Sequence, residues 1–173
     1  WVEGENLEDL LDALRNADQR LPITRACRIG RDVARGLAEL HEHGVVHLDL
    51  KPANVMVRPG ADGRDEIKLV DFGIAADLRA TAGDAEPAWG SLVMGSSAYM
   101  APEQLRGCAA KPSCDVYALG VVLFESISGR SVPPQGWMPE ALPRLETLRR
   151  GVPTALADLV RACLEVDPQR RPA

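Results

Sequence analysis

Residues 47–54 read His-Leu-Asp-Leu-Lys-Pro-Ala-Asn, and residues 71–73 read Asp-Phe-Gly. In the first stretch, Asp49 offers a carboxylate, Lys51 an ammonium and Asn54 a carboxamide, while Asp71 adds a carboxylate from a separate turn. This combination suits phosphoryl transfer, because it provides a base near an attacking hydroxyl, a cation for a phosphate and two oxygen ligands for Mg²⁺. Such chemistry depends mainly on positioning and charge stabilisation, and these side chains supply both.

Three further motifs follow in order along the chain. They read Gly-Ser-Ser-Ala-Tyr-Met-Ala-Pro-Glu at 95–103, Asp-Val-Tyr-Ala-Leu-Gly at 115–120 and Asp-Pro-Gln-Arg-Arg-Pro at 167–172. Together the five motifs resemble those of the large lobe of protein kinases, and the resemblance covers nearly the whole chain. The residues at 49–54 and 99–104 are similar to the corresponding motifs of bacterial kinases of the eukaryotic-like serine/threonine type.

The resemblance implies a role for each matched residue. Asp49 would act as the base or orienter of an acceptor hydroxyl, and Lys51 would neutralise the γ-phosphate. Asn54 and Asp71 would bind Mg²⁺, and Met56 would lie under the adenine ring, so the implied cofactors are ATP and Mg²⁺. Supporting roles fall to His47 and Phe72 in a hydrophobic stack, Gly73 in the metal-binding turn, Ser96 bridging Asp49 and Lys51, Glu103 and Arg171 as a buried ion pair, and Asp115 as acceptor for backbone N–H groups of the catalytic loop.

Leu48 departs from the family pattern, in which most regulated members carry arginine at this position. That arginine usually pairs with a phosphorylated residue of the activation segment, and leucine cannot form such a pair. We therefore expect constitutive activity or control through another contact.

The implied fold is α+β: a mainly helical large lobe with short β-strands around the catalytic loop. Residues 1–173 would form a partial kinase domain, from just after the interlobe hinge to the segment of Arg171. The catalytic loop would span 47–54 and the activation segment 71–103. No Gly-rich strand pair, strand lysine or partner helix glutamate occurs in the chain, so we expect the small lobe to be missing and the chain alone to be inactive.

The residue pattern predicts where helices and strands lie. Asn6 can cap a helix through residue 14 with Asp9 at its third position, and Thr24 can cap a second helix that ends before Gly44. Residues 45–46, 55–57 and 67–70 are typical of short strands, and 74–98 of a long irregular segment. Apolar residues at 114–128 predict a buried helix, and 142–150 and 155–165 predict two amphipathic helices.

Composition narrows the class of protein further. The net charge of −5 gives no basic surface for nucleic acid, and no apolar run approaches the length of a membrane span. The four cysteines show no metal-ligand or redox spacing, so we expect buried or half-buried reduced thiols and a cytoplasmic location. The sequence carries no signal for the oligomeric state.

The leading hypothesis is a serine/threonine protein kinase that phosphorylates protein hydroxyls. A pseudokinase or an isolated lobe acting as a binding module is the alternative, although the intact Asp49, Asn54 and Asp71 argue against loss of activity. A small-molecule phosphotransferase ranks lower, because such enzymes do not normally carry the motif at 95–103 or the aspartate that opens the helix at 115.

Overall fold

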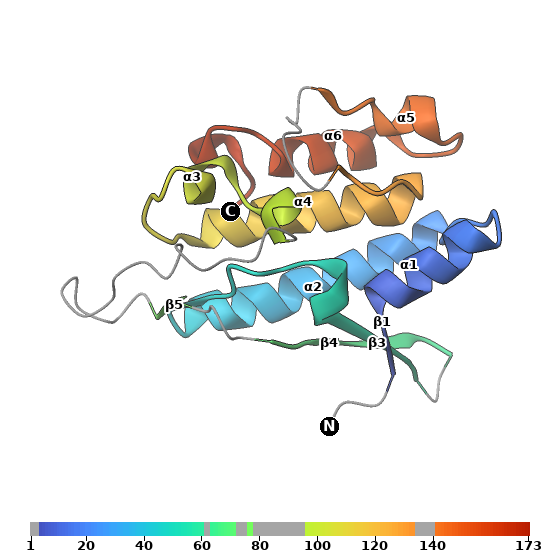
Figure 1. Cartoon of the computed structure of the whole chain (residues 1–173), viewed down its shortest axis with the longest axis horizontal. Coiled ribbons are helices and arrows are strands. Elements are labelled where there is room, and N and C mark those ends of the chain that lie inside the picture. Colours follow the sequence, from blue (N-terminus) through green and yellow to red (C-terminus); the bar gives the residue numbers. More distant parts are fainter. Residues whose placement is uncertain (1–3, 61–62, 72–75, 78–95, 134–140) are drawn as a thin grey trace.

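The chain is mainly helical with a few short strands, so the α+β class expected from the sequence is confirmed (Figure 1). This computed structural model describes residues 4–60, 63–71, 76–77, 96–133 and 141–173. Phe72 and Gly73 lie outside the described residues. Among the described helices, none is long and apolar enough to cross a membrane.

The first two helices begin in different ways. Helix α1 spans Leu7–Asn16, and Asn6 caps it by accepting a hydrogen bond from the backbone N–H of Asp9 at 2.8 Å. Helix α2 spans Ile23–Glu42, so the prediction that Thr24 caps it was wrong. Pro22 takes that position, and its carbonyl accepts hydrogen bonds from the N–H groups of residues 25 and 26. Gly44 follows α2 with a φ of 78°, the left-handed conformation that commonly ends a helix.

Helix α4, Pro112–Ser128, forms the centre of the molecule. It packs against α2 on one side and against α6, Thr154–Cys163, on the other (Figure 1). Gly120 permits the second contact, because a Cβ atom there would lie 2.8 Å from the Cβ of Cys163. Gly129, with a φ of 72°, ends α4 as the apolar pattern predicts. The one-turn helix α3 spans Pro102–Leu105.

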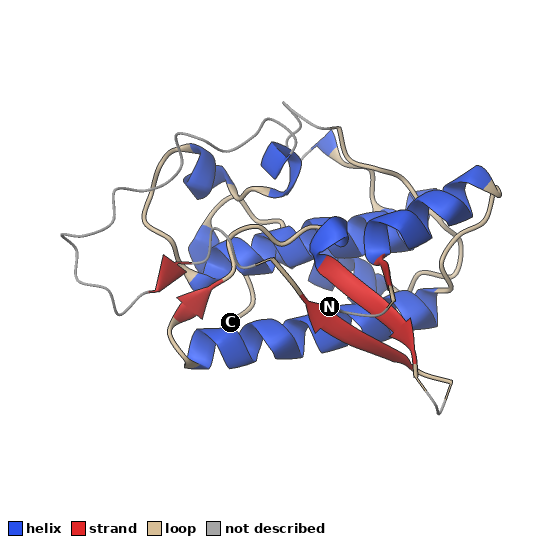
Figure 2. Cartoon of the chain, turned by 60° about the horizontal axis from the view of Figure 1, so that its bottom comes forward, coloured by secondary structure: helices blue, strands red, loops and turns tan. Residues whose placement is uncertain are grey.

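In the described part of the chain, two small antiparallel sheets flank the 47–54 loop (Figure 2). In the first, β3 (Val55–Pro59) lies between β1 (Glu5–Asn6) and β4 (Asp65–Leu69), with Val55 opposite Leu69. In the second, β2 (Val45–Val46) pairs with β5 (Ala76–Asp77). Among the residues that the structure describes, short 3₁₀ helices form at η1 (Pro52–Asn54), η3 (Ser96–Tyr99) and η5 (Pro168–Arg170). The 47–54 loop therefore runs from one sheet to the other.

The helix predicted over 142–150 is the main correction to the fold. Only one turn forms, α5, at Leu145–Leu148. Arg149 leaves the helical conformation, with a φ of −146°, and donates hydrogen bonds to the carbonyls of Leu21 at 2.7 Å and Ile127 at 2.8 Å. The carbonyl of Ile127 lies in the last turn of α4, where carbonyls have no partner within the helix. If α5 continued through Arg149, this carbonyl would lose the hydrogen bond from Arg149.

Candidate active site

The 47–54 loop is tied to the first turn of α4 by a buried carboxylate. Asp115 is fully buried, and its Oδ1 accepts a hydrogen bond from the backbone N–H of Leu48 at 2.8 Å. Its Oδ2 accepts from the backbone N–H of His47 at 2.9 Å and lies 2.8 Å from Nε2 of His41. The carboxylate thus fixes two consecutive peptide groups just before Asp49.

Leu48 occupies the left-handed backbone region, with a φ of 66°. This conformation costs a residue with a Cβ atom roughly 1 kcal/mol or more, and hydrogen bonds on both sides of the residue oppose that cost. The N–H of Leu48 donates to Asp115, and its carbonyl accepts from Nε2 of Gln104 at 3.2 Å. The Leu48 side chain lies in the hydrophobic core with 6% of its surface exposed, so this position presents apolar packing.

The side chains of Asp49, Lys51 and Asn54 form one cluster. Oδ2 of Asp49 accepts hydrogen bonds from Nζ of Lys51 at 2.7 Å and from Nδ2 of Asn54 at 3.0 Å. Nδ2 of Asn54 also donates to the backbone carbonyl of Asp49 at 2.8 Å. The single turn of η1 makes this possible, because it folds the chain back so that the N–H of Asn54 reaches the carbonyl of Lys51.

Asn54 and Asp71 lie close in the fold through their backbones. The N–H of Val70 donates to the carbonyl of Asn54 at 3.0 Å, which holds the residue before Asp71 against η1. Asp71 is exposed and has a φ of 62°, a conformation that aspartate tolerates better than most residues. The side chain of Asn54 forms its hydrogen bonds through Nδ2 only, so among the described residues none donates to its Oδ1.

These oxygen atoms fit the ligand preference of Mg²⁺. An amide oxygen and a carboxylate are hard donors, and Mg²⁺ often binds one or two protein groups while water and phosphate complete its coordination. In the described part of the chain, no group of three or more His, Cys, Asp or Glu could hold a metal ion. A shared site with few protein ligands therefore matches the residues present better than an all-protein cage.

Met56 lies on the face of β3 opposite to the core. Val55 and Val57 are buried at 0% and 1% exposure, whereas Met56 between them is half-buried. Alternation along the strand directs the two kinds of side chain to opposite faces. Met56 is thus one of the apolar groups available on the sheet beside Asn54.

A buried ion pair joins α3 to the end of the chain. Nη1 and Nη2 of Arg171 donate to the two carboxylate oxygens of Glu103 at 2.6 and 2.8 Å. Arg171 also donates to the carbonyls of Ser113 and Glu165 and lies 5.0 Å from the ring centroid of Tyr117. Burial tends to raise the pKa of Glu103, but the hydrogen bonds from Arg171 and the local backbone outweigh it and hold this pKa below its ordinary value.

Two other residues with predicted supporting roles are described to different extents. His47 is fully buried at the start of the loop, in keeping with a packing residue. Ser96 opens η3, while its side chain lies outside what the structure describes.

Sequence reasoning missed two residues that hold the loop, His41 and Gln104. His41 lies in the last turn of α2, and Gln104 in α3 also accepts a hydrogen bond from the N–H of Ala101 at 2.9 Å. His41 belongs to none of the motifs, and the motif at 99–104 gives no sign that Gln104 binds the loop, because the two partners are 74 and 56 residues away along the chain. Only a three-dimensional arrangement brings them to the loop.

An acidic cavity of about 240 Å³ adjoins η1 at Pro52. Its charged lining is Glu8, Asp12 and Glu125 against one arginine, Arg15. Glu125 is buried and accepts hydrogen bonds from the hydroxyl of Tyr99 at 3.0 Å and the N–H of Val132 at 2.7 Å. Burial raises the pKa of Glu125, although both hydrogen bonds oppose the shift. Among its described lining residues, the cavity therefore carries a surplus of acidic groups beside Pro52 of η1.

The fold and this arrangement of loop, cluster and ion pair are those of a protein kinase. The family model for the protein kinase domain matches residues 1–173, and the chain belongs to this family. The crystal structure of the Mycobacterium tuberculosis PknI kinase domain is similar, with a TM-score of 0.74 and 25% sequence identity over 99% of this chain and 58% of that chain.

Curated relatives come from several bacteria. Pkn2 of Myxococcus xanthus, a serine/threonine-protein kinase, is 34% identical over 99% of this chain and 21% of its own length. PknA of Mycobacterium tuberculosis, also a serine/threonine-protein kinase, is 34% identical over 99% of this chain and 37% of its own. CPE1738 of Clostridium perfringens, a probable serine/threonine-protein kinase, is 33% identical over 99% of this chain and 24% of its own. The chain thus spans less than two-fifths of these relatives.

Proposed function

We propose that this chain carries the catalytic residues of a serine/threonine protein kinase, which transfers the γ-phosphoryl group of MgATP to Ser or Thr hydroxyls of proteins. The observation that carries the proposal is the double hydrogen bond at Oδ2 of Asp49, from Lys51 and from Asn54. It combines an oriented carboxylate, a cation and an amide within one loop. The names of the curated relatives support serine and threonine as acceptors.

Each member of the cluster has a distinct part in this reaction. Asp49 orients the acceptor hydroxyl and takes its proton through Oδ1, which forms no hydrogen bond with any described residue. Lys51 neutralises negative charge that develops on the transferring group. Asn54 holds Asp49 with Nδ2 and, with Asp71, would hold Mg²⁺ through its free amide oxygen. When bound, Mg²⁺ neutralises charge on the phosphate oxygens and orients them.

The acidic cavity beside Pro52 supports a preference for basic acceptor segments. Three carboxylates and one arginine leave a local excess of negative charge, which attracts a lysine or arginine of an incoming peptide. A cation there would also offset the cost of burying Glu125 in its ionised form. In the whole protein, a peptide with arginine near its serine should have a higher kcat/KM than the same peptide with glutamine. Equal values would remove this part of the proposal.

Regulation and location complete the proposal. Leu48 lies in the core, so control by pairing a phosphate with this position is not part of the mechanism, and phosphatase treatment should leave activity largely unchanged. A cytoplasmic location is supported by the four cysteines, all of which are free thiols.

The decisive experiment measures transfer of radiolabelled phosphate from ATP to a generic protein substrate by the whole protein. Asp49→Asn and Asp71→Asn should each lower the rate by at least about a hundredfold, because they remove the base and a metal ligand. Asp158→Asn, at an exposed aspartate, is the matched control and should retain activity. Equal incorporation by the wild type and both site variants would reject catalysis and favour a pseudokinase or binding module.

A further inference from the structure

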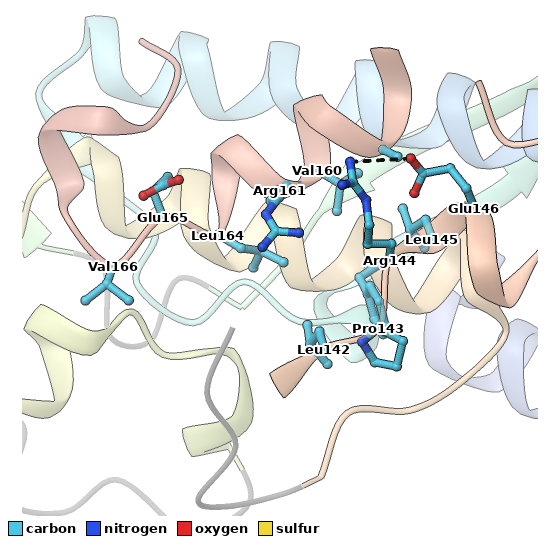
Figure 3. A pocket seen from close by; sticks show the side chains of 12 residues that line it. Leu142, Pro143, Arg144, Leu145, Glu146, Val160, Arg161, Leu164, Glu165 and Val166 are labelled. Atoms are coloured by element: carbon cyan, nitrogen blue, oxygen red, sulfur yellow. Dashed lines mark ion pairs between the residues drawn. The ribbon is translucent and has the colours of Figure 1, made fainter. Parts of the chain in front are cut away.

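A second cavity, of about 130 Å³, is lined by residues of α4, α5 and α6 (Figure 3). Helices α5 and α6 lie on the opposite side of α4 from α2 (Figure 1). The cavity is a half-open hollow lined by residues of α4, the segment 142–146, α6 and residues 164–166. Nothing in the proposed phosphoryl transfer uses this cavity, since the 47–54 loop lies on the other side of α4.

The inner wall of the cavity consists of buried apolar side chains. Its buried side chains come from α4, α5, α6 and the residue that follows α6, and each has less than a tenth of its surface exposed; they are Phe124, Leu145, Ala157, Val160 and Leu164. A dry apolar cavity of about 150 Å³ is known to hold a benzene ring. The space here therefore suits one aromatic or large aliphatic group and is too small for a long acyl chain.

The outer edge of the cavity carries two arginines and two glutamates (Figure 3). Arg144 pairs with Glu146 at 3.7 Å, and Glu165 pairs with Arg170 at 3.8 Å. Arg161 is exposed, and within the described ranges its guanidinium forms no hydrogen bond or ion pair. Glu146 shares Arg144 with Asp158, which lies 3.4 Å from that arginine, and Glu165 has Arg170, so Arg161 remains as the cation that a ligand could neutralise.

We propose that this cavity binds a short acidic segment of a partner protein, with one phenylalanine- or leucine-like side chain in the cavity and a flanking Asp or Glu on Arg161. The size of the cavity selects a single apolar anchor, and the uncommitted guanidinium selects an adjacent carboxylate. The site is separate from the phosphoryl-transfer cluster, so its binding can be measured whether or not the proposed kinase activity holds.

Fluorine NMR of a small probe peptide tests this site on the whole protein. The probe is N-acetyl-Asp-Phe-Asp-amide with a fluorinated phenylalanine ring, and its line broadening reports binding even at millimolar Kd. The matched Asn-Phe-Asn peptide removes both carboxylates while keeping the anchor. We expect the Asp peptide to bind at least about fivefold more tightly, as expected for one or two partly exposed ion pairs.

Two variants separate the anchor from the charge. Arg161→Glu should weaken binding of the Asp peptide at least about fivefold and leave the Asn peptide nearly unchanged. Ala157→Leu fills the cavity and should abolish binding of both peptides; because overpacking a buried position is destabilising, a cooperative urea unfolding transition checks that the variant is folded. Arg28→Glu, at an exposed arginine on α2, is the control for charge reversal and should change neither Kd.

Three results would overturn the proposal. Equal broadening of the Asp and Asn peptides would remove the role of Arg161, and broadening that survives Ala157→Leu would locate the probe elsewhere. A dimer in sedimentation velocity that Ala157→Leu dissociates would assign the cavity to a second copy of this chain instead.

Discussion

Replacing Asp115 by asparagine should destabilise the chain by about 2–4 kcal/mol, although the two side chains have nearly the same shape. The carboxylate accepts backbone hydrogen bonds through both oxygens, from Leu48 at Oδ1 and from His47 at Oδ2. An asparagine amide has one acceptor and one donor end, so in either orientation its NH₂ faces a backbone N–H. One buried N–H loses its acceptor, at about 1–3 kcal/mol, and the remaining bonds lose charge assistance worth about 1 kcal/mol.

Urea denaturation followed by circular dichroism measures this loss. Asp158→Asn, whose side chain is 59% exposed, serves as control and should stay within about 0.5 kcal/mol of the wild type. Hydrogen exchange adds a local readout, since the amides of His47 and Leu48 should exchange faster in the Asp115 variant. A loss below about 0.5 kcal/mol with unchanged exchange at both amides would show that the carboxylate does not hold the loop.

Three other predictions follow from burial and pairing. Arg171→Met and Glu103→Leu should each lower the free energy of unfolding, measured by urea denaturation, by about 3–5 kcal/mol, because each leaves a buried charge without its partner. The double variant should lose at least about 1 kcal/mol less than the sum of the two single losses. Strictly additive losses would contradict the ion pair. The folded-state pKa of Glu103 lies below its ordinary 4.5, so its contribution to stability is complete above that pH and is lost as the pH falls through the folded pKa. Glu103→Gln should therefore flatten the fall in the free energy of unfolding at acid pH. An unchanged fall would refute the assignment. Burial raises the pKa of Cys114 to about 12 and that of Cys163 to about 11. Iodoacetamide at pH 8 should therefore label the exposed Cys108 in the native chain, and Cys114 and Cys163 only after unfolding. Labelling of Cys114 or Cys163 in the native chain would contradict their burial.

Local signals in the sequence predict most of the helices and strands. Asn6, Gly44 and Gly129 lie at helix ends as predicted, because capping depends on a few neighbouring residues. Thr24 illustrates the limit of such signals. It is a good capping residue, yet Pro22 two positions earlier sets the start of α2 through its fixed φ and its carbonyl.

Contacts between distant segments explain what the sequence could not predict. The amphipathic pattern over 142–150 does not reveal that Arg149 binds carbonyls on two other elements, which limits α5 to one turn. Cys108 was expected to be at least half-buried and is exposed, since it follows the short α3 on the surface. At the site, motifs predict Asp49, Lys51 and Asn54 as one cluster, whereas the part played by His41 depends on how α2 packs against α4.

The rigid geometry of α4 couples two sites that local sequence treats as separate. Asp115 holds the 47–54 loop near the start of this helix, and Glu125 lines the acidic cavity ten residues later. At about 1.5 Å per residue, the two carboxylates are spaced roughly 15 Å apart along the helix axis. A single inserted or deleted residue between them would rotate one by about 100° relative to the other. Substitutions at the cavity can therefore change its charge or shape while the loop keeps its position. An insertion or deletion between Asp115 and Glu125 would instead change how the cavity is placed relative to the loop.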